Sequence, residues 1–228
     1  MKVLSKINDF IKKDYKSANL NAGFMINPYA FGVAGVAGAT RGVLMGGQTV
    51  GTTTIDYITI ATAGNATSFG TLTTANGYTA GVNSSTRGVI CGGNGGAGNV
   101  LDYITIATTG NATSFGTDTG VFYPQAACNS DVRGVLFSGD TASIRYITIA
   151  TTGNATSFGT LSASSSNFGA AVNSSTRGVI AFGQGVAEEI VNVLEYITIA
   201  TTGNATDFGD LIIARFGASG VNSSTRGV

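Results

Sequence analysis

Histidine and tryptophan are absent from this 228-residue chain, and it holds only two cysteines and two prolines. Without histidine, Ser-His-Asp and Cys-His catalysis, imidazole metal ligands and a histidine pH switch are all excluded. Two cysteines alone cannot build a structural zinc site. We therefore expect no catalytic residues, no metal and no cofactor.

Charge is also scarce. Charged residues make up 11% of the chain, against about 25% in an ordinary globular protein. Glycine takes 34 positions, and Ile, Val, Thr, Tyr and Phe are abundant. This composition argues against a long helical bundle and favours strands. We predict an all-β protein.

The few charges are unevenly placed. All lysines lie in the first sixteen residues, which are net positive, whereas the rest of the chain is net negative. The main part has no basic stripe that could release counterions from a phosphate backbone, so we expect no binding to nucleic acid.

Long apolar runs are missing too. No stretch of about 18 apolar residues could span a membrane as a helix. Charged residues such as Lys6, Asp9 and Lys12 interrupt any apolar segment of a secretory signal. Asn-x-Ser/Thr sites recur, for example at Asn65 and Asn222, but they accept glycans only in a secretory pathway. We interpret them as part of a repeat.

That internal repeat is the main feature of the sequence. Arg-Gly-Val occurs five times and Tyr-Ile-Thr-Ile-Ala-Thr four times, with a glycine seven residues and a phenylalanine twelve residues after each tyrosine. The unit is about 45 residues long, within the range of propeller blades. The repeated arginines are Arg41, Arg87, Arg133, Arg177 and Arg226, and the repeated glycines are Gly64, Gly110, Gly153 and Gly203.

Each unit predicts four short strands. In the second unit they cover residues 78–82, 87–91, 103–107 and 113–117, and a Gly-Asn turn with positive φ joins the last two. Four strands in such a unit are typical of a β-propeller blade. The prediction is an all-β propeller of four-stranded antiparallel blades over residues 23–228, with four full repeats and a partial fifth.

The register assigns apolar positions to the contacts between blades. One set stands five residues before each arginine and comprises Val36, Val82, Cys128, Val172 and Val221. The other stands two residues after it and comprises Val43, Val89, Val135, Val179 and Val228. Both cysteines, Cys91 and Cys128, occupy apolar positions, so we expect small buried hydrophobes rather than a disulfide.

The repeated arginine allows two interpretations. Five arginines in one register could form a functional ring, or each could start the second strand and donate to carbonyls of its own Thr-Thr-Gly-Asn turn. We favour the structural role, because strands two and three are antiparallel and bring that turn to the arginine's end.

Length varies almost only between the second and third strands, in residues 48–53, 94–100, 140–143 and 184–193. Insertions on one face often mark a binding face, and neutral drift of loops is the equal alternative. The candidate binding residues in these loops are Gln48, Asn94, Asp140, Gln184, Glu188 and Glu189.

These units resemble kelch-like propeller repeats. The glycine pairs Gly46-Gly47 and Gly92-Gly93 and the third-strand tyrosine match that pattern, while phenylalanines stand near the place of the missing tryptophan. More specifically, residues 196–211 resemble a repeat of virion proteins of tailed bacteriophages, often associated with tails or fibres. The resemblance covers about residues 30–228 and implies a structural or adsorption-related virion component.

The expected function is therefore a non-enzymatic structural component of a phage virion, tail- or fibre-associated, whose propeller contacts proteins or the host surface. The alternative is a carbohydrate-binding, lectin-like module. A kelch-type radical copper enzyme is a third class, and the missing histidines remove its metal ligands.

The N-terminal segment, residues 1–22, falls outside the repeats. Val3, Leu4, Ile7, Phe10 and Ile11 share one helical face, which predicts an amphipathic helix from about residue 2 to 16. We expect it to dock on another virion protein or another copy of the chain. Binding to a membrane surface is the competing interpretation.

The fifth unit ends within its second strand. An incomplete blade leaves unpaired edge groups, so we expect either a longer chain of about six or seven blades or a partner that completes the last blade.

Overall fold

The computed structural model describes residues 32–33, 41–47, 52–77, 79–93, 99–118, 124–138, 141–163, 165–167, 169–185, 189–223 and 225–228. Four four-stranded antiparallel sheets account for most of them, which confirms the all-β class. The N-terminal segment 1–22, with its predicted helix, lies outside the described residues. Within the described ranges, no helix is long and apolar enough to cross a membrane.

Each sheet corresponds to one repeat and pairs its strands in chain order. The first sheet contains β1 (Gly32–Val33), β2 (Arg41–Met45), β3 (Thr52–Thr59) and β4 (Thr67–Asn76). The second contains β5 (Ala80–Asn83), β6 (Arg87–Cys91), β7 (Val100–Thr105) and β8 (Thr113–Thr117). The third contains β9 (Pro124–Asn129), β10 (Arg133–Ser138), β11 (Ser143–Thr148) and β12 (Thr156–Thr160). The fourth contains β14 (Ala170–Asn173), β15 (Arg177–Ala181), β17 (Val193–Thr198) and β18 (Thr206–Asp210).

The second strand of every sheet begins at the repeated arginine, as predicted. The third strand begins earlier than predicted, because residues before the tyrosine also pair with the second strand. A register shift between third and fourth strands recurs in all four sheets, for example at Leu101/Asp102. Such bulges increase the local twist of a strand pair. The structural repeat therefore includes this irregularity in the pairing of the third and fourth strands.

A small fifth sheet occupies the place of an expected loop. It pairs β13 (Ser165–Asn167) with β16 (Gln184–Gly185), which lies between the second and third strands of the fourth sheet. The longest of the variable segments therefore has strand structure of its own.

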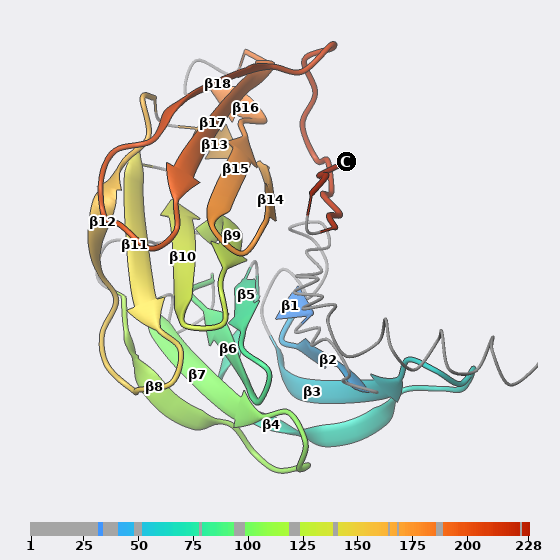
Figure 1. The fold of residues 1–228 in the computed structure, drawn as a ribbon. Helices are drawn as coiled ribbons and strands as arrows, with labels where there is room; N and C mark the ends of the chain where they lie inside the picture. Colours follow the sequence, from blue (N-terminus) through green and yellow to red (C-terminus); the bar gives the residue numbers. More distant parts are fainter. Residues whose placement is uncertain are drawn as a thin grey trace, which may run out of the picture.

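The four sheets follow one another along an arc (Figure 1). The first strands β1, β5, β9 and β14 lie on its concave side, and neighbouring first strands contact each other. The fourth strands lie on the convex side. Among the described residues, the arc stays open between the fourth sheet and the first, so the sheets are blade-like without a closed ring.

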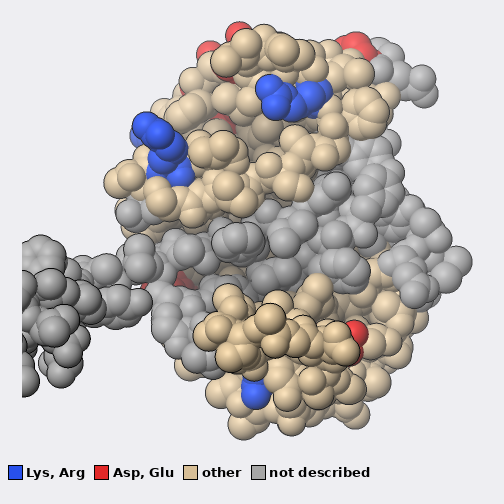
Figure 2. Space-filling view, turned by 90° about the vertical axis from the view of Figure 1, so that its right-hand side faces the viewer, with Lys and Arg blue, Asp and Glu red and all other residues tan. Residues whose placement is uncertain are grey.

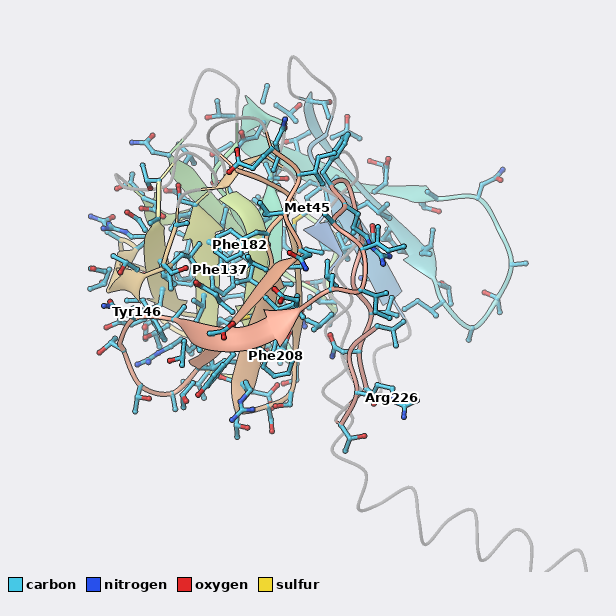
Figure 3. All side chains as sticks on the ribbon, turned by 90° about the horizontal axis from the view of Figure 1, so that it is seen from above. Met45, Phe137, Tyr146, Phe182, Phe208 and Arg226 are labelled. Carbon is cyan, nitrogen blue, oxygen red and sulfur yellow. The ribbon has the colours of Figure 1, made fainter. Side chains whose placement is uncertain are left out.

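The core consists of layers of apolar side chains between successive sheets. The predicted contact positions Val43, Val82, Val89, Val135 and Cys128 are all buried, and Phe137 and Phe182 lie within the same interior (Figure 3). In the last units the prediction is wrong. Val172 and Val179 are only half-buried, whereas Val221 and Val228 are 44% and 80% exposed. No described sheet follows them that could cover their side chains; Val36 lies outside the described residues.

Candidate functional site

The repeated arginines connect each sheet to the next one. Arg87 Nη1 donates to the carbonyl oxygens of Ile149 and Ala150, which directly follow β11 of the third sheet, at 3.0 and 2.8 Å. In the same way Arg41 donates to the carbonyl oxygen of Ile106, directly after β7, and Arg133 donates to those of Ile199 and Ala200, directly after β17. Each guanidinium also lies over the tyrosine of its own sheet, 4.3 to 4.5 Å from the ring centroid.

We expected the acceptor in the arginine's own hairpin, and that detail is wrong. The acceptor carbonyls do lie just before a Thr-Thr-Gly-Asn segment. That segment, however, belongs to the following sheet and not to the arginine's own hairpin. The tyrosine stack explains the direction, because it holds the guanidinium on the face of the sheet where cation–π attraction operates. From that face the N–H groups of the guanidinium reach carbonyl oxygens of the neighbouring sheet.

The segment between the third and fourth strands of a sheet forms hydrogen bonds with the fourth strand of the previous sheet. In the second sheet it includes the Gly-Asn-Ala loop, residues 110–112. Gly110 N donates to Phe69 O at 2.9 Å and Ala112 N to Thr71 O at 2.8 Å, while the Asn111 side chain accepts from Thr71 N. Residues 153–155 and 203–205 form the same bonds with β8 and β12. Each loop therefore extends the ladder of the sheet before it.

The glycine of this loop has no positive φ, contrary to our prediction for a Gly-Asn turn. A Cβ built at Gly110 would meet no atom within 4 Å. The sterically demanding glycine is the one after the repeated phenylalanine. A Cβ at Gly70 would overlap the carbonyl of Gly110, and one at Gly159 that of Gly203. The repeated Phe-Gly pair in the sequence marks this glycine. The steric reason for the glycine is the Gly-Asn-Ala loop of the next unit, which lies against it.

A ladder of asparagines lines the inner ends of the sheets. Asn129 Nδ2 donates to Asn83 O at 2.7 Å, and Asn173 Nδ2 donates to Asn129 O at 2.8 Å. Asn222 of the incomplete fifth unit accepts from Asn173 N at 3.3 Å. This last contact differs from the other two, but the pairing of Asn222 with Gly227 and the bond from Ser223 N to Arg226 O repeat those of Asn173 with Gly178 and Ser174 N with Arg177 O, so the fifth unit begins in the register of the other four.

In the second, third and fourth sheets, the residue directly before the repeated tyrosine is charged. Its side chain binds the part of the chain that leads in from the preceding sheet. Buried Asp102 accepts from Thr73 N and Oγ1 at 2.8 Å, and Glu195 accepts from Ser162 N. In the third sheet Arg145 forms an ion pair with Asp118 at 3.1 Å. Charges at this position therefore fix the link from one sheet to the next.

On β17 and β18 of the fourth sheet the same contact groups have no partner sheet among the described residues. The Arg177 guanidinium stacks on Tyr196 at 4.5 Å, but it has no carbonyl acceptor among the described residues. Phe208 is 50% exposed, whereas the equivalent Phe158 is 4% exposed. A Cβ at Gly209 would meet no described atom within 4 Å. Figure 3 shows Phe208 on the outermost sheet. We call this surface, formed by Arg177 and β18, the outgoing face.

The first sheet presents the complementary groups. Ile60 is 59% exposed, whereas its counterparts Ile106, Ile149 and Ile199 are buried. Ile58 is also exposed, and residues 64–66 form a Gly-Asn-Ala loop with exposed side chains. We call this surface, formed by Ile58, Ile60 and residues 64–66, the incoming face.

A cavity of about 370 Å³ lies beside the outgoing face. Val179, Arg177 and Phe208 line one side, and Asn222, Ser223, Thr225 and Arg226 of the fifth unit line the other. In a complete unit, the third and fourth strands would follow Arg226 and pack against this wall.

The predicted loop residues are only partly described. Gln48, Asn94, Asp140 and Glu188 lie outside the described residues. Gln184 is half-buried in β16, and Glu189 is exposed. Gly185 N donates to Glu189 O at 2.8 Å and Gln184 forms a bridge with Ile190, so the structure brings Gln184 and Glu189 close together. On the face shown in Figure 2, the described surface carries only isolated charged groups.

The cysteines are free and buried. Burial raises the pKa of the Cys128 thiol to about 12, and that of Cys91 rises further, with the charge of Asp118 as a second cause. Cys128 lies against Gly178, at the position that Val82 takes against Gly134. Both thiols therefore act as packing groups.

Comparison with known proteins supports the fold alone. No protein-family model and no curated protein sequence matches the chain. A solved structure, described as a novel fungal alcohol oxidase of the AA5 family in complex with copper, matches with a TM-score of 0.63 and 11% identity. The match covers 86% of this chain but only 44% of that protein. Its copper has no counterpart in the residue types here, because this sequence holds no histidine and the described residues contain no metal-binding group of His, Cys, Asp or Glu.

Proposed function

We propose that the sheets are blades of a kelch-like propeller, and that the chain is a non-enzymatic virion component associated with a phage tail or fibre. Its role is to present the segments between the second and third strands to a protein or to the host surface. The N-terminal segment, residues 1–22, attaches the repeats to another virion protein.

One observation carries this proposal: the repeated residues serve contacts between sheets, whereas the varied residues lie between the second and third strands. Arg87, Asn111 and Gly70 illustrate the first group, since each contacts a neighbouring sheet. Because all four sheets share one topology, each second strand ends and each third strand begins on the same side of its sheet. A constant framework with one variable edge suits binding better than catalysis.

The location can be tested on purified particles of the phage that encodes the chain. Peptide mass spectrometry should find repeat peptides in amounts comparable to the tail proteins. Particles without these peptides would refute the virion role. A variant lacking residues 1–20 should keep its folded sheets, by circular dichroism, and be lost from the particles.

The binding edge can be tested separately with the purified chain. It should bind host cells, and exchanging residues 184–193 for the short segment 140–143 should reduce binding at least tenfold, the effect of about 1.4 kcal/mol. The control is Val132→Lys, an exposed site outside these segments. A glycan array with the same proteins identifies a lectin, if binding follows a sugar and is lost in the exchange variant.

A further inference from the structure

The repeated arginines use only part of their guanidinium groups inside the chain. In Arg41, Arg87 and Arg133 the atom that donates to the next sheet is Nη1 in every case. Among the described residues, no hydrogen bond or ion pair engages Nε or Nη2 of these three side chains, and neither atom is enclosed by protein. What these free atoms bind does not depend on a virion role.

Nε and Nη2 together form the side of a guanidinium that holds an oxyanion by two parallel hydrogen bonds. Arginine recognises carboxylate and phosphate groups in this way, because its N–H groups have a fixed planar geometry. In the three arginines the stack on the tyrosine, at 4.3 to 4.4 Å, and the Nη1 bonds already hold that plane in place. Little side-chain freedom is left to lose on binding. We call this pair of atoms the free edge of each arginine.

Uncharged hydroxyl groups flank the free edge along the chain. At Arg87 they belong to Ser85 and Thr86, directly before the arginine, and to Thr151 and Thr152, directly after the acceptor carbonyls. All four residues are exposed, and their hydroxyl groups form no hydrogen bond with the described residues. A hydroxyl group both donates and accepts, so this surrounding suits the hydroxyl groups of a sugar.

The free edge recurs once in each unit along the arc. Packed sheets lie about 10 Å apart, so neighbouring edges are expected at about that interval. Phosphates along one nucleic acid strand follow at about 3.4 Å, which is much denser. The edges instead fit a polymer whose anionic groups are separated by neutral parts. A single exposed ion pair contributes little, so useful affinity requires several edges to be occupied at once.

We propose that the free edges of Arg41, Arg87 and Arg133 bind an acidic polysaccharide, with one carboxylate or phosphate group at each edge. The neutral sugars between these groups contact the exposed hydroxyl side chains. This surface lies at the opposite end of the sheets from the variable segments, because each second strand begins at its arginine and ends before a variable segment.

One of the three edges has an acidic neighbour. Asp131 stands in the third unit where the second and fourth units have Ser85 and Ser175. It is exposed, lies two residues before Arg133 and forms no ion pair with a described residue. Its negative charge repels an oxyanion bound nearby. Asp131→Ser should therefore strengthen binding without removing a contact of Arg133.

The test measures binding of the full chain to two immobilised polymers by biolayer interferometry. Hyaluronate has one carboxylate for every two sugars, and poly(glycerol phosphate) supplies phosphate groups instead. The chain should bind at least one of them, more weakly as salt is raised, and should not bind neutral dextran. The polymer that binds identifies the oxyanion. Its monomer, at the same concentration of anionic groups, should not compete.

Three variants locate the site. Asp131→Ser should raise the affinity about two- to fivefold, the effect of one exposed charge. Its control, Glu189→Gln, removes an exposed acid at the opposite end of the fourth sheet and should leave the affinity unchanged. Arg87→Lys keeps the charge but lacks the free edge, so it should lower the affinity about fivefold. Circular dichroism checks that it folds, and if it does not, the comparison of Asp131→Ser with Glu189→Gln decides.

Four results would each overturn the proposal. They are no binding to either acidic polymer, a gain in Asp131→Ser no larger than in Glu189→Gln, unchanged binding in a folded Arg87→Lys chain, and equally tight binding to single-stranded oligodeoxythymidylate. Binding of host cells through residues 184–193 would be unaffected by any of them, so failure here is distinct from failure of the proposed function.

Discussion

The interface between the third and fourth sheets and the outgoing face of the fourth sheet are built from the same residues. Phe158 and Phe208 follow the same motif, and both rings meet the tyrosine of their own sheet edge-on at 6.1 Å. Yet the first is buried and the second half-exposed. The difference comes from the neighbouring sheet, which supplies the cover, the loop and the acceptor carbonyls.

The stability of a repeat protein has two sources. Each unit contributes its own hairpins, and each interface adds a nearest-neighbour term. A residue at an internal interface contributes to its own unit and to the interface, whereas a residue on the outgoing or incoming face contributes to its own unit alone. Equivalent substitutions should therefore have unequal effects, and their difference measures the interface.

The largest difference is expected at the repeated phenylalanine. Phe158→Ala should lower the free energy of unfolding by about 4 kcal/mol, because it leaves a cavity between two sheets. Phe208→Ala should cost about 1 kcal/mol, since half of that ring is already in water. Urea unfolding of both variants measures the gap. Equal losses would mean that the fourth sheet is covered in solution.

Glycine substitution should give the next largest difference. Gly159→Ala directs a methyl group into the carbonyl of Gly203 and should cost about 2 to 3 kcal/mol. Gly203→Ala meets no atom and has no positive φ to strain, so it should stay within about 0.5 kcal/mol. Thermal unfolding compares the two. A larger loss at Gly203 would refute the placement of this loop against β12.

The arginines should differ less. Arg133→Ala removes two bonds to backbone carbonyls and a cation–π contact, for a loss of about 2 kcal/mol. Arg177→Ala removes only the contact with Tyr196 and should cost about 0.5 kcal/mol. Denaturant titrations at low protein concentration measure both. If Arg177→Ala matched Arg133→Ala there, the outgoing face would already have a partner within one chain.

The smallest effect concerns the buried thiols. Because the pKa of Cys128 rises to about 12 in the folded chain, against about 8.5 when unfolded, folding favours the protonated form. Its contribution to stability is complete below about pH 8.5 and is lost as the pH rises toward 12. At pH 8 a thiol reagent should label neither cysteine until denaturant is added. Rapid labelling of the native chain would show that these layers open.

Much of the fold could be predicted from sequence, because its signals are local. The repeat period located four units, and the second and fourth strands of the second unit were placed correctly at residues 87–91 and 113–117. Burial of Val82 and Val89 followed from register alone. Hairpin partners lie close along the chain, so composition and spacing carry that information.

The candidate site was less accessible to prediction. Gln184 lies in β16, which pairs with β13 in a small sheet that no periodic pattern in the sequence predicted. The φ prediction for Gly110 used turn statistics, whereas the loop is shaped by its bonds to β4.

What the sequence by itself determined is the repeating unit, its strands and the positions that repeat. The tertiary structure alone decided that each arginine reaches the next sheet, that the Phe-Gly glycine is the sterically required one, and that identical residues end buried or exposed. The physical reason is separation along the chain. The arginine and its acceptor are 62 to 67 residues apart, so their contact exists only once two sheets stand side by side.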